Sequence, residues 1–173
     1  MTPAPSPAPG PGGRVGDLAA MQRAIELAAG VRRMTSPNPW VGCLVVAADG
    51  QVFEGATEPP GGRHAEVMAL DAAGEQARGS TMYVTLEPCA HQGRTPPCAT
   101  AIAASGVRRV VSAVGDPDPN VAGRGYAAMR QAGVEVIEGV GAEAAADQLA
   151  PYLKHRRTGR PWVVLKLAAT LDG

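Results

Sequence analysis

The spacing of apolar residues near the start of the chain predicts a helix over 18–29. Its apolar positions recur every three or four residues: Leu18, Met21, Ile25 and Ala28. Asp17 stands where a helix N-cap is expected, and Gly30 is placed to end the helix. The preceding segment, 1–15, is rich in Pro, Ala and Gly and has no apolar periodicity, so we expect a disordered tail there.

A β-hairpin is predicted after this helix. Residues 40–48 form a mostly apolar run that is typical of a buried strand, and the Asp-Gly pair at 49–50 is a strong turn signal. Residues 51–57 are therefore expected to return as the antiparallel partner of the first strand.

From residue 64 onward the pattern alternates between helix and strand. Predicted helices cover 64–78, 98–105, 125–132 and 142–155, and predicted strands cover 81–86, 108–114 and 134–138. Such alternation favours a largely parallel sheet with helices on both faces. With the hairpin, it predicts an α/β fold: a three-layer α/β/α sandwich around a mixed, mostly parallel five-stranded sheet. Ligands of such sheets bind at the carboxyl ends of the strands.

The composition of the chain reduces the number of candidate functions. The chain has 173 residues, enough for one domain, and its formal net charge is zero, which argues against a nucleic-acid partner and favours a small-molecule substrate. No apolar run is long enough to cross a bilayer and no signal peptide is recognisable, so we expect a cytoplasmic protein. The richness in Arg, Ala, Gly and Pro indicates a bacterial source of high GC content.

The cysteines indicate metal chemistry. In a reducing compartment, the three cysteines are expected to bind metal or to react rather than to form disulfides. Cys89 and Cys98 are the close pair, whereas Cys43 lies in the apolar run VGCLVV and is expected to be a small buried side chain.

The candidate site combines TLEPCAHQGRTPPC, at 85–98, with the HAE that begins at His64. His64, Cys89 and Cys98 supply the three ligands of a catalytic zinc, which leaves a fourth position for water and lowers the pKa of that water to about 7. Glu66 is close enough to take a proton from this water and pass it to a leaving group. An HAE or two cysteines alone are weak signals, but together they match the signature of zinc deaminases of bases and nucleosides.

Four segments carry a family resemblance: SPNPWVGCLVV at 36–46, GGRHAEVMAL at 61–70, YVTLEPCAHQGRTPPC at 83–98 and DPDPNVAGRG at 116–125. They resemble the deaminase domain of the bifunctional riboflavin-biosynthesis enzymes, the RibD or RibG family, from about residue 21 to the end of the chain. Most of the wider superfamily separates the two cysteines by two residues. Here eight residues, 90–97, separate them, as in the riboflavin family.

The resemblance implies a cytidine deaminase-like fold, one zinc ion per chain and one reaction. That reaction is hydrolytic removal of the 2-amino group from 2,5-diamino-6-ribosylamino-4(3H)-pyrimidinone 5′-phosphate, which gives 5-amino-6-(ribosylamino)uracil 5′-phosphate and ammonia. Glu66 is expected to act first as the base and then as the acid.

The resemblance also implies contacts to the substrate. Asn38 is expected to bind the base, although Asn before Pro is also a usual turn pair. Ala65 is expected among the substrate contacts. His91 is expected in the pocket, with a fourth zinc ligand in a closed structural site as the alternative. Arg94 suits a ribose phosphate, and its alternative is a solvated surface side chain.

Asp116 and Asp118 follow a predicted strand at the same edge of the sheet and are expected to bind ribose hydroxyls. The sequence here is DPDP, where many members of the family have DPNP, so the role of Asp118 is open. The alternative for both residues is a simple turn.

We assign 16–156 to a zinc-dependent deaminase domain and 157–173 to the start of a reductase domain, which the last segment resembles. One strand cannot form a dinucleotide-binding domain, so we expect neither reductase activity nor NADPH binding. Association with a reductase domain or with further copies of the chain stays open.

Two other functions stay open as well. One is a deaminase of the same fold that acts on another base, nucleoside or tRNA, and the other is a non-catalytic module stabilised by zinc. The neutral charge argues against tRNA, and the basic residue in the long cysteine loop argues for a phosphorylated small molecule.

Overall fold

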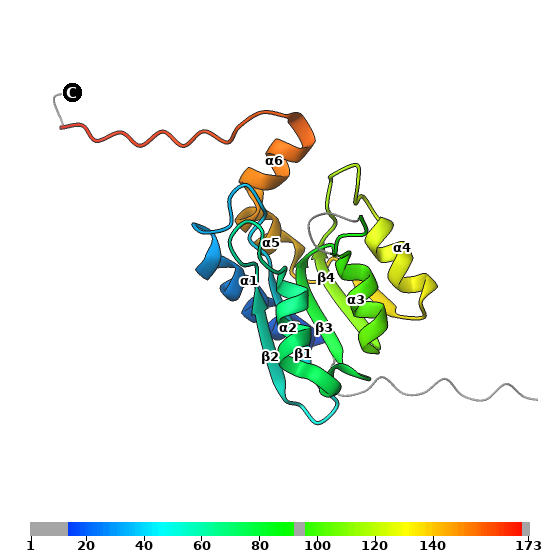
Figure 1. Cartoon of the computed structure of the whole chain (residues 1–173). Helices are drawn as coiled ribbons and strands as arrows, with labels where there is room; N and C mark the ends of the chain where they lie inside the picture. Colours follow the sequence, from blue (N-terminus) through cyan, green and yellow to red (C-terminus); the bar gives the residue numbers. More distant parts are fainter. Residues whose placement is uncertain (1–13, 92–95, 171–173) are drawn as a thin grey trace, which may run out of the picture.

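The computed structural model describes residues 14–91 and 96–170. The helices, shown in Figure 1, are α1 (Arg14–Val31), α2 (Ala65–Ala73), the 3₁₀ helix η1 (Gly74–Ala77), α3 (Cys98–Ser105), α4 (Arg124–Gln131), α5 (Ala142–Gln148) and α6 (Ala150–Thr158). The strands are β1 (Gly42–Val46), β2 (Val52–Ala56), β3 (Thr81–Leu86), β4 (Arg109–Val114) and β5 (Glu135–Glu138). No helix in these two stretches has the length and hydropathy needed to cross a membrane.

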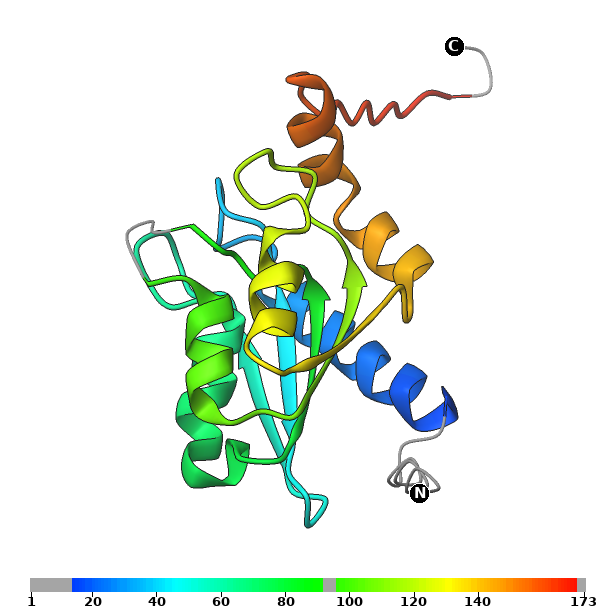
Figure 2. The ribbon, with the colours of Figure 1, turned by 90° about the vertical axis from the view of Figure 1, so that its right-hand side faces the viewer.

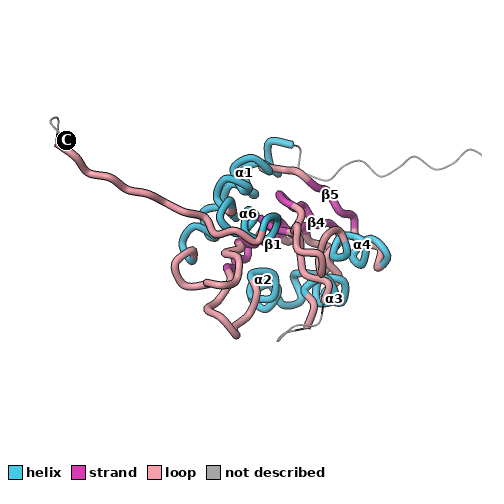
Figure 3. The backbone as a smooth tube through the Cα atoms, turned by 90° about the horizontal axis from the view of Figure 1, so that it is seen from above, coloured by secondary structure: helices cyan, strands magenta, loops and turns pink. Residues whose placement is uncertain are grey.

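The strands form one five-stranded sheet in the order β2-β1-β3-β4-β5. β1 pairs antiparallel with both of its neighbours, and β3, β4 and β5 pair in parallel, so β1 alone runs against the other four strands. Helices α1 and α5 cover one face, while α2, α3 and α4 cover the other, as Figures 2 and 3 show. The predicted three-layer α/β/α fold with a mixed, mostly parallel sheet is confirmed.

The predicted hairpin between β1 and β2 is present. Gly50 has a φ of +88°, a value that glycine adopts without strain, and the N–H of Gln51 donates to Oδ1 of Asp49 at 3.0 Å. The turn sets the register in which Val46 lies opposite Val52.

Two predicted helices differ from the observed ones. The helix predicted over 142–155 is two helices, because Pro151 lacks an N–H and fits only the first turn of a new helix, α6. The helix predicted over 64–78 ends as α-helix at Ala73. Gly74 then takes a φ of +50° and begins a 3₁₀ turn.

Asp17 does not cap α1. It lies inside the helix, buried against the sheet, where its carboxylate accepts hydrogen bonds from the Tyr83 hydroxyl at 2.9 Å and from two guanidinium nitrogens of Arg109 at 3.0 and 2.8 Å. This bidentate pair turns the face of α1 that holds Asp17 and Met21 towards the sheet. Leu18, about 100° around the helix from Asp17, is consequently 54% exposed, contrary to its predicted place in the apolar stripe.

Helix α2 packs unusually close to β2 at Gly55. A Cβ at this glycine would overlap the carbonyl oxygen of Ala65 and lie 2.6 Å from the backbone nitrogen of Ala69. Because only glycine leaves that space free, the backbone of α2 rests directly on the strand. This contact fixes the start of α2, where His64 stands.

Residues 160–170 follow α6 without secondary structure, and Figure 1 shows them leading away from the sheet. Their apolar side chains are largely exposed, among them Val163, Leu165 and Leu167 at 77–78%. Helix α6 itself continues past residue 156 to Thr158, so no break in the structure marks the domain boundary assigned there. That boundary stays a prediction. Of the tail predicted over 1–15, residues 1–13 lie outside the described residues, and residues 14–15 already belong to α1.

Replacing Asp17 with Asn should lower the free energy of unfolding by about 2–3 kcal/mol, because the partly buried Arg109 guanidinium loses its bidentate counter-ion and keeps only the longer contact to Glu135 at 3.8 Å. Arg109 lowers the pKa of Asp17 below its ordinary 3.8. The wild-type advantage is therefore complete above about pH 4 and is lost as the pH falls through that lowered pKa. Urea unfolding of both proteins as a function of pH measures it. Glu26→Gln, which removes an exposed ion pair with Arg23, is the control and should cost less than about 0.5 kcal/mol. Equal effects of the two substitutions would contradict this account.

Candidate metal centre and substrate pocket

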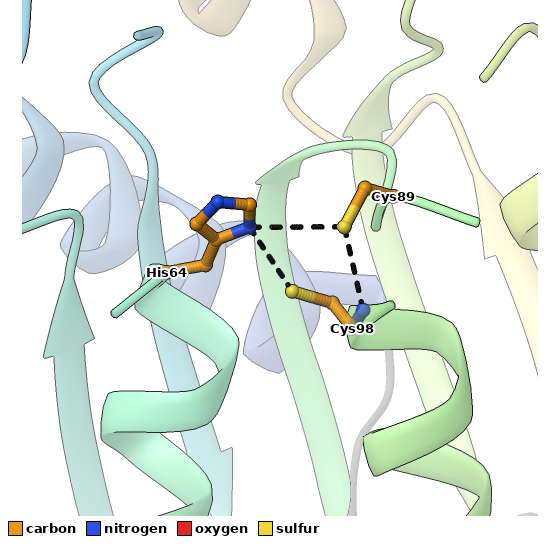
Figure 4. A group of neighbouring side chains, drawn as sticks. All are labelled: His64, Cys89 and Cys98. Atoms are coloured by element: carbon orange, nitrogen blue, oxygen red, sulfur yellow. Dashed lines mark hydrogen bonds between the residues drawn. The ribbon is translucent and has the colours of Figure 1, made fainter. Parts of the chain in front are cut away.

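Three potential metal ligands meet where strands end and helices begin. His64 is the residue that precedes α2, Cys89 follows the end of β3, and Cys98 is the first residue of α3. Figure 4 shows the three side chains pointing toward one another from these elements. The position agrees with the general rule that ligands bind at the carboxyl ends of strands in such sheets.

The distances within this cluster suit one zinc ion. Nδ1 of His64 lies 3.2 Å from Sγ of Cys98 and 3.7 Å from Sγ of Cys89, and the three ligand atoms all lie within 4.8 Å of one another. Ligand atoms on one tetrahedral zinc are about 3.5–3.8 Å apart, given the usual Zn–N and Zn–S distances. Two sulfurs and an imidazole nitrogen are also the donors that zinc prefers. The cluster therefore fits a single zinc ion.

The local environment favours a thiolate at Cys89. Its sulfur receives hydrogen bonds from the Cys98 thiol, from the His64 ring and from the Cys98 backbone N–H at 3.3 Å, and these lower the pKa of the Cys89 thiol. The backbone donor belongs to the first turn of α3, where the helix dipole also favours negative charge. Cys89 is therefore suited to act as the deprotonated sulfur ligand that a metal requires.

Glu66 lies in the first turn of α2, next to the cluster. Its side chain is buried, and this burial raises the pKa of its carboxyl group. A carboxyl group whose pKa moves towards neutrality is suited to take up and release protons in turn.

A pocket of about 590 Å³ opens beside the cluster. Its lining brings together most of the residues singled out in the sequence: Asn38, His64, Glu66, Cys89, His91, Asp116 and Asp118. Cys98 is fully buried and is not among the described lining residues. Ala65 is also fully buried and is absent from the described lining, so its contact with substrate stays a prediction. Arg94 lies outside the described residues.

The two aspartates after β4 belong to a turn and to the pocket at once. Oδ1 of Asp116 accepts the N–H of Asp118 at 2.9 Å, and Oδ1 of Asp118 accepts the N–H of Asn120 at 2.9 Å. The Tyr152 hydroxyl, from α6, donates to Oδ2 of Asp116 at 2.9 Å. The turn alternative is thus correct as local structure, yet it leaves both side chains in the pocket lining.

Glu87 is a residue of the site that the sequence interpretation missed. Its buried carboxylate accepts three backbone N–H groups, from Asp116 at 3.2 Å, Gly123 at 3.0 Å and Gly125 at 3.0 Å. The available signal was an acidic residue at the end of an uninterrupted buried strand, where a carboxylate needs several donors. Its place two residues before Cys89 connects the loop after β3 to the loop after β4.

Tyr152 and Arg156 of α6 were missed as well. Both line the pocket, and Arg156 pairs with Asp118 at 3.2 Å. Their four-residue spacing puts them on one helix face, but nothing in the sequence showed that this face is turned towards the site.

The mixed sheet with His, Cys and Glu side chains at the carboxyl ends of its strands defines a zinc deaminase-like protein. The family of the cytidine and deoxycytidylate deaminase zinc-binding region matches residues 15–114, and the chain belongs to it. The matched range contains His64, Glu66, Cys89 and Cys98.

Within this family, the chain is similar to longer proteins of riboflavin biosynthesis. The riboflavin biosynthesis protein RibD of Escherichia coli is 51% identical over 153 residues, which are 88% of this chain and 42% of that protein. The solved structure of Acinetobacter baumannii RibD, at 50% identity, superposes with a TM-score of 0.89 and is matched over 93% of this chain and 45% of its own. The chain thus spans less than half the length of these relatives.

A third relative is described by its two activities. The crystal structure of a diaminohydroxyphosphoribosylaminopyrimidine deaminase/5-amino-6-(5-phosphoribosylamino)uracil reductase from Thermotoga maritima has 42% identity and a TM-score of 0.84. The match covers 92% of this chain and 46% of that one. The resemblance to the riboflavin-biosynthesis family is confirmed by these relatives.

Replacing either cluster cysteine, as Cys89→Ser or Cys98→Ser, should reduce bound zinc from about one to below about 0.2 per chain after dialysis, because a structural or catalytic zinc requires its thiolates. Metal analysis of the purified proteins measures this. Cys43→Ala is the control, since Cys43 is a buried core residue outside the cluster, and it should keep its zinc. Zinc loss from the Cys43 variant, or full retention in the other two, would overturn the assignment.

Glu87→Gln should lower the free energy of unfolding of the zinc-loaded protein by about 2 kcal/mol, because the amide nitrogen turns N–H donors towards backbone N–H groups. Urea unfolding measures the change. Glu143→Gln, at an exposed position on α5, serves as control and should have little effect. A stability equal to that of wild type would show that the three hydrogen bonds of Glu87 do not hold the loop.

Proposed function

We propose that this chain removes the 2-amino group of 2,5-diamino-6-ribosylamino-4(3H)-pyrimidinone 5′-phosphate by hydrolysis, giving 5-amino-6-(ribosylamino)uracil 5′-phosphate and ammonia. The observation that carries the proposal is the position of the buried Glu66 carboxylate beside a zinc-type cluster in a pocket. Identities of 42–51% to proteins of riboflavin biosynthesis support the choice of substrate.

In this proposal His64, Cys89 and Cys98 hold the metal. A zinc ion bound by them supplies a Lewis acid that lowers the pKa of water at its open position to about 7. The pocket side of the cluster, where His64 and Cys89 are part of the lining, is where water and substrate approach.

Glu66 moves the protons. It takes a proton from the attacking water as the water oxygen bonds to the ring carbon that carries the amino group, and it passes this proton to the ring nitrogen. It then transfers the second proton of the water to the amino nitrogen. The carbon–nitrogen bond breaks, ammonia leaves, and the carbon keeps its oxygen as a carbonyl. The raised pKa of Glu66 suits both directions of transfer.

The remaining pocket residues suit the substrate's other groups. The side-chain amide of Asn38 offers a donor and an acceptor to the pyrimidine edge, and Asp116 and Asp118 offer acceptors to ribose hydroxyls. We assign the phosphate to Arg94 by family resemblance. His91 is exposed at the pocket rim, away from the three-ligand cluster, which supports a pocket role over that of a fourth zinc ligand.

The descriptions of the relatives support a reductase domain as a partner. The Thermotoga maritima protein is described as both a deaminase and a reductase, and it is more than twice as long as the stretch matched here. We propose that the described part of this chain carries the deaminase step alone. The reduction then belongs to a reductase domain outside it, with which this domain associates.

Glu66→Gln should lower kcat for ammonia release about a thousandfold, since general acid–base catalysis loses its proton carrier, while zinc stays bound. Ammonia release from the purified ribotide, together with metal analysis, measures both properties. Glu75→Gln, in the exposed 3₁₀ helix that continues α2, should act like wild type. Normal turnover by the Glu66 variant would refute the role, and release of ammonia from cytidine or guanine but not from the ribotide would refute the substrate.

A further inference from the structure

The pocket is rich in carboxyl groups and poor in basic side chains. Four carboxylate side chains line it, those of Glu66, Glu87, Asp116 and Asp118, and Arg156 is the single Lys or Arg among its described lining residues. The substrate of the proposed function carries a phosphate, and each carboxylate of the lining whose charge is not offset repels that phosphate. The position of the one described cation therefore matters for binding.

Arg156 is held in place by two contacts. Its guanidinium pairs with Oδ2 of Asp118 at 3.2 Å, and its Cζ lies over the ring of Tyr152, 5.3 Å from the ring centroid. Tyr152 stands one helical turn earlier on α6 and donates its hydroxyl to Asp116. One face of α6 thus engages both aspartates of the loop after β4.

Asp118 has no second cation of this kind in the described lining. Its other oxygen accepts the N–H of Asn120, a neutral donor that orients the carboxylate but does not offset its charge. The side chain of Asp118 is 12% exposed and that of Arg156 is 41% exposed, so water screens the pair only in part. Without Arg156, the Asp118 charge would face the pocket uncompensated.

We propose that Arg156 is a positioning residue that lets the pocket accept a phosphorylated ribose: it fixes the Asp118 carboxylate and offsets its charge. The inference rests on the proposed function, because it concerns how the same site takes an anionic substrate. In this proposal Arg156 acts through Asp118 and does not bind the phosphate directly. The two possibilities differ in what happens when Asp118 is made neutral.

A double-mutant cycle separates them. KM and kcat for ammonia release are measured for wild type, Arg156→Ala, Asp118→Asn and the double variant, with zinc content and thermal stability recorded for each. Arg156→Ala should raise KM about fivefold, the size expected for a partly screened charge pair, with kcat within about twofold. In the Asp118→Asn background, the same Arg156 substitution should change KM less than about twofold.

Two further variants secure the interpretation. Arg156→Gln keeps the aliphatic stem against Tyr152 and replaces Arg156→Ala if the alanine protein is unstable, while Arg156→Lys keeps the charge and should restore most of the affinity. Arg157→Ala, at the next and exposed position of α6, is the matched control and should leave KM unchanged.

Binding of ribose 5-phosphate, followed by NMR titration of the same zinc-loaded proteins, gives a readout that does not need the reaction. Its Kd should follow the same pattern, so a wild type that releases no ammonia would refute the proposed function without removing this test. An unchanged KM and Kd in Arg156→Ala would overturn the inference. An equal loss in both backgrounds would also overturn it, because Arg156 would then contact the phosphate directly.

Discussion

The oxygens of a buried carboxylate have to accept hydrogen bonds, because they have lost their contacts with water. At Glu87 this requirement determines the arrangement of the site. Its oxygens take the backbone N–H groups of Asp116, Gly123 and Gly125, which lie at both ends of the loop after β4. Because Glu87 is two residues from Cys89, one side chain sets the position of the sulfur-bearing loop and of the aspartate loop together. The cluster and the far wall of the pocket thus form one unit.

Close backbone packing fixes the position of this unit at the ends of the strands. At Gly55 the start of α2 rests on β2, and at Gly125 a Cβ would overlap the carbonyl oxygen of Pro88, so the start of α4 rests on the segment that follows Glu87. Both helices consequently begin at the level where the strands end. That level is also where His64 and Cys98 meet, so the small residues that permit the packing contribute to the site without touching it.

The strands, the hairpin and the candidate ligands were predictable from the sequence because their signals are local: alternation, an Asp-Gly turn and a spaced motif. The contacts of Asp17 were not, since its partners Tyr83 and Arg109 lie 66 and 92 residues away in the chain. A residue before a helical pattern is read as a cap, and only tertiary packing shows that the helix begins earlier. Tyr152 and Arg156 were not predicted for the same reason, because α6 is oriented by tertiary contacts with α5 and with the loop after β4.

The four pocket carboxylates differ in how the fold satisfies them, and this difference separates structural from chemical tasks. Glu87 accepts hydrogen bonds from backbone N–H groups, and Asp116 accepts them from a tyrosine hydroxyl and a backbone N–H. Asp118 accepts one from a backbone N–H and pairs with an arginine. Glu66 instead lies against the His64 and cysteine cluster, where burial is the largest influence and raises its pKa. A carboxylate held by fixed donors is a poor proton carrier, because proton uptake would cost it those bonds. Among the four, Glu66 is the one that stands beside the cluster that would bind the water, and this position suits it to proton transfer.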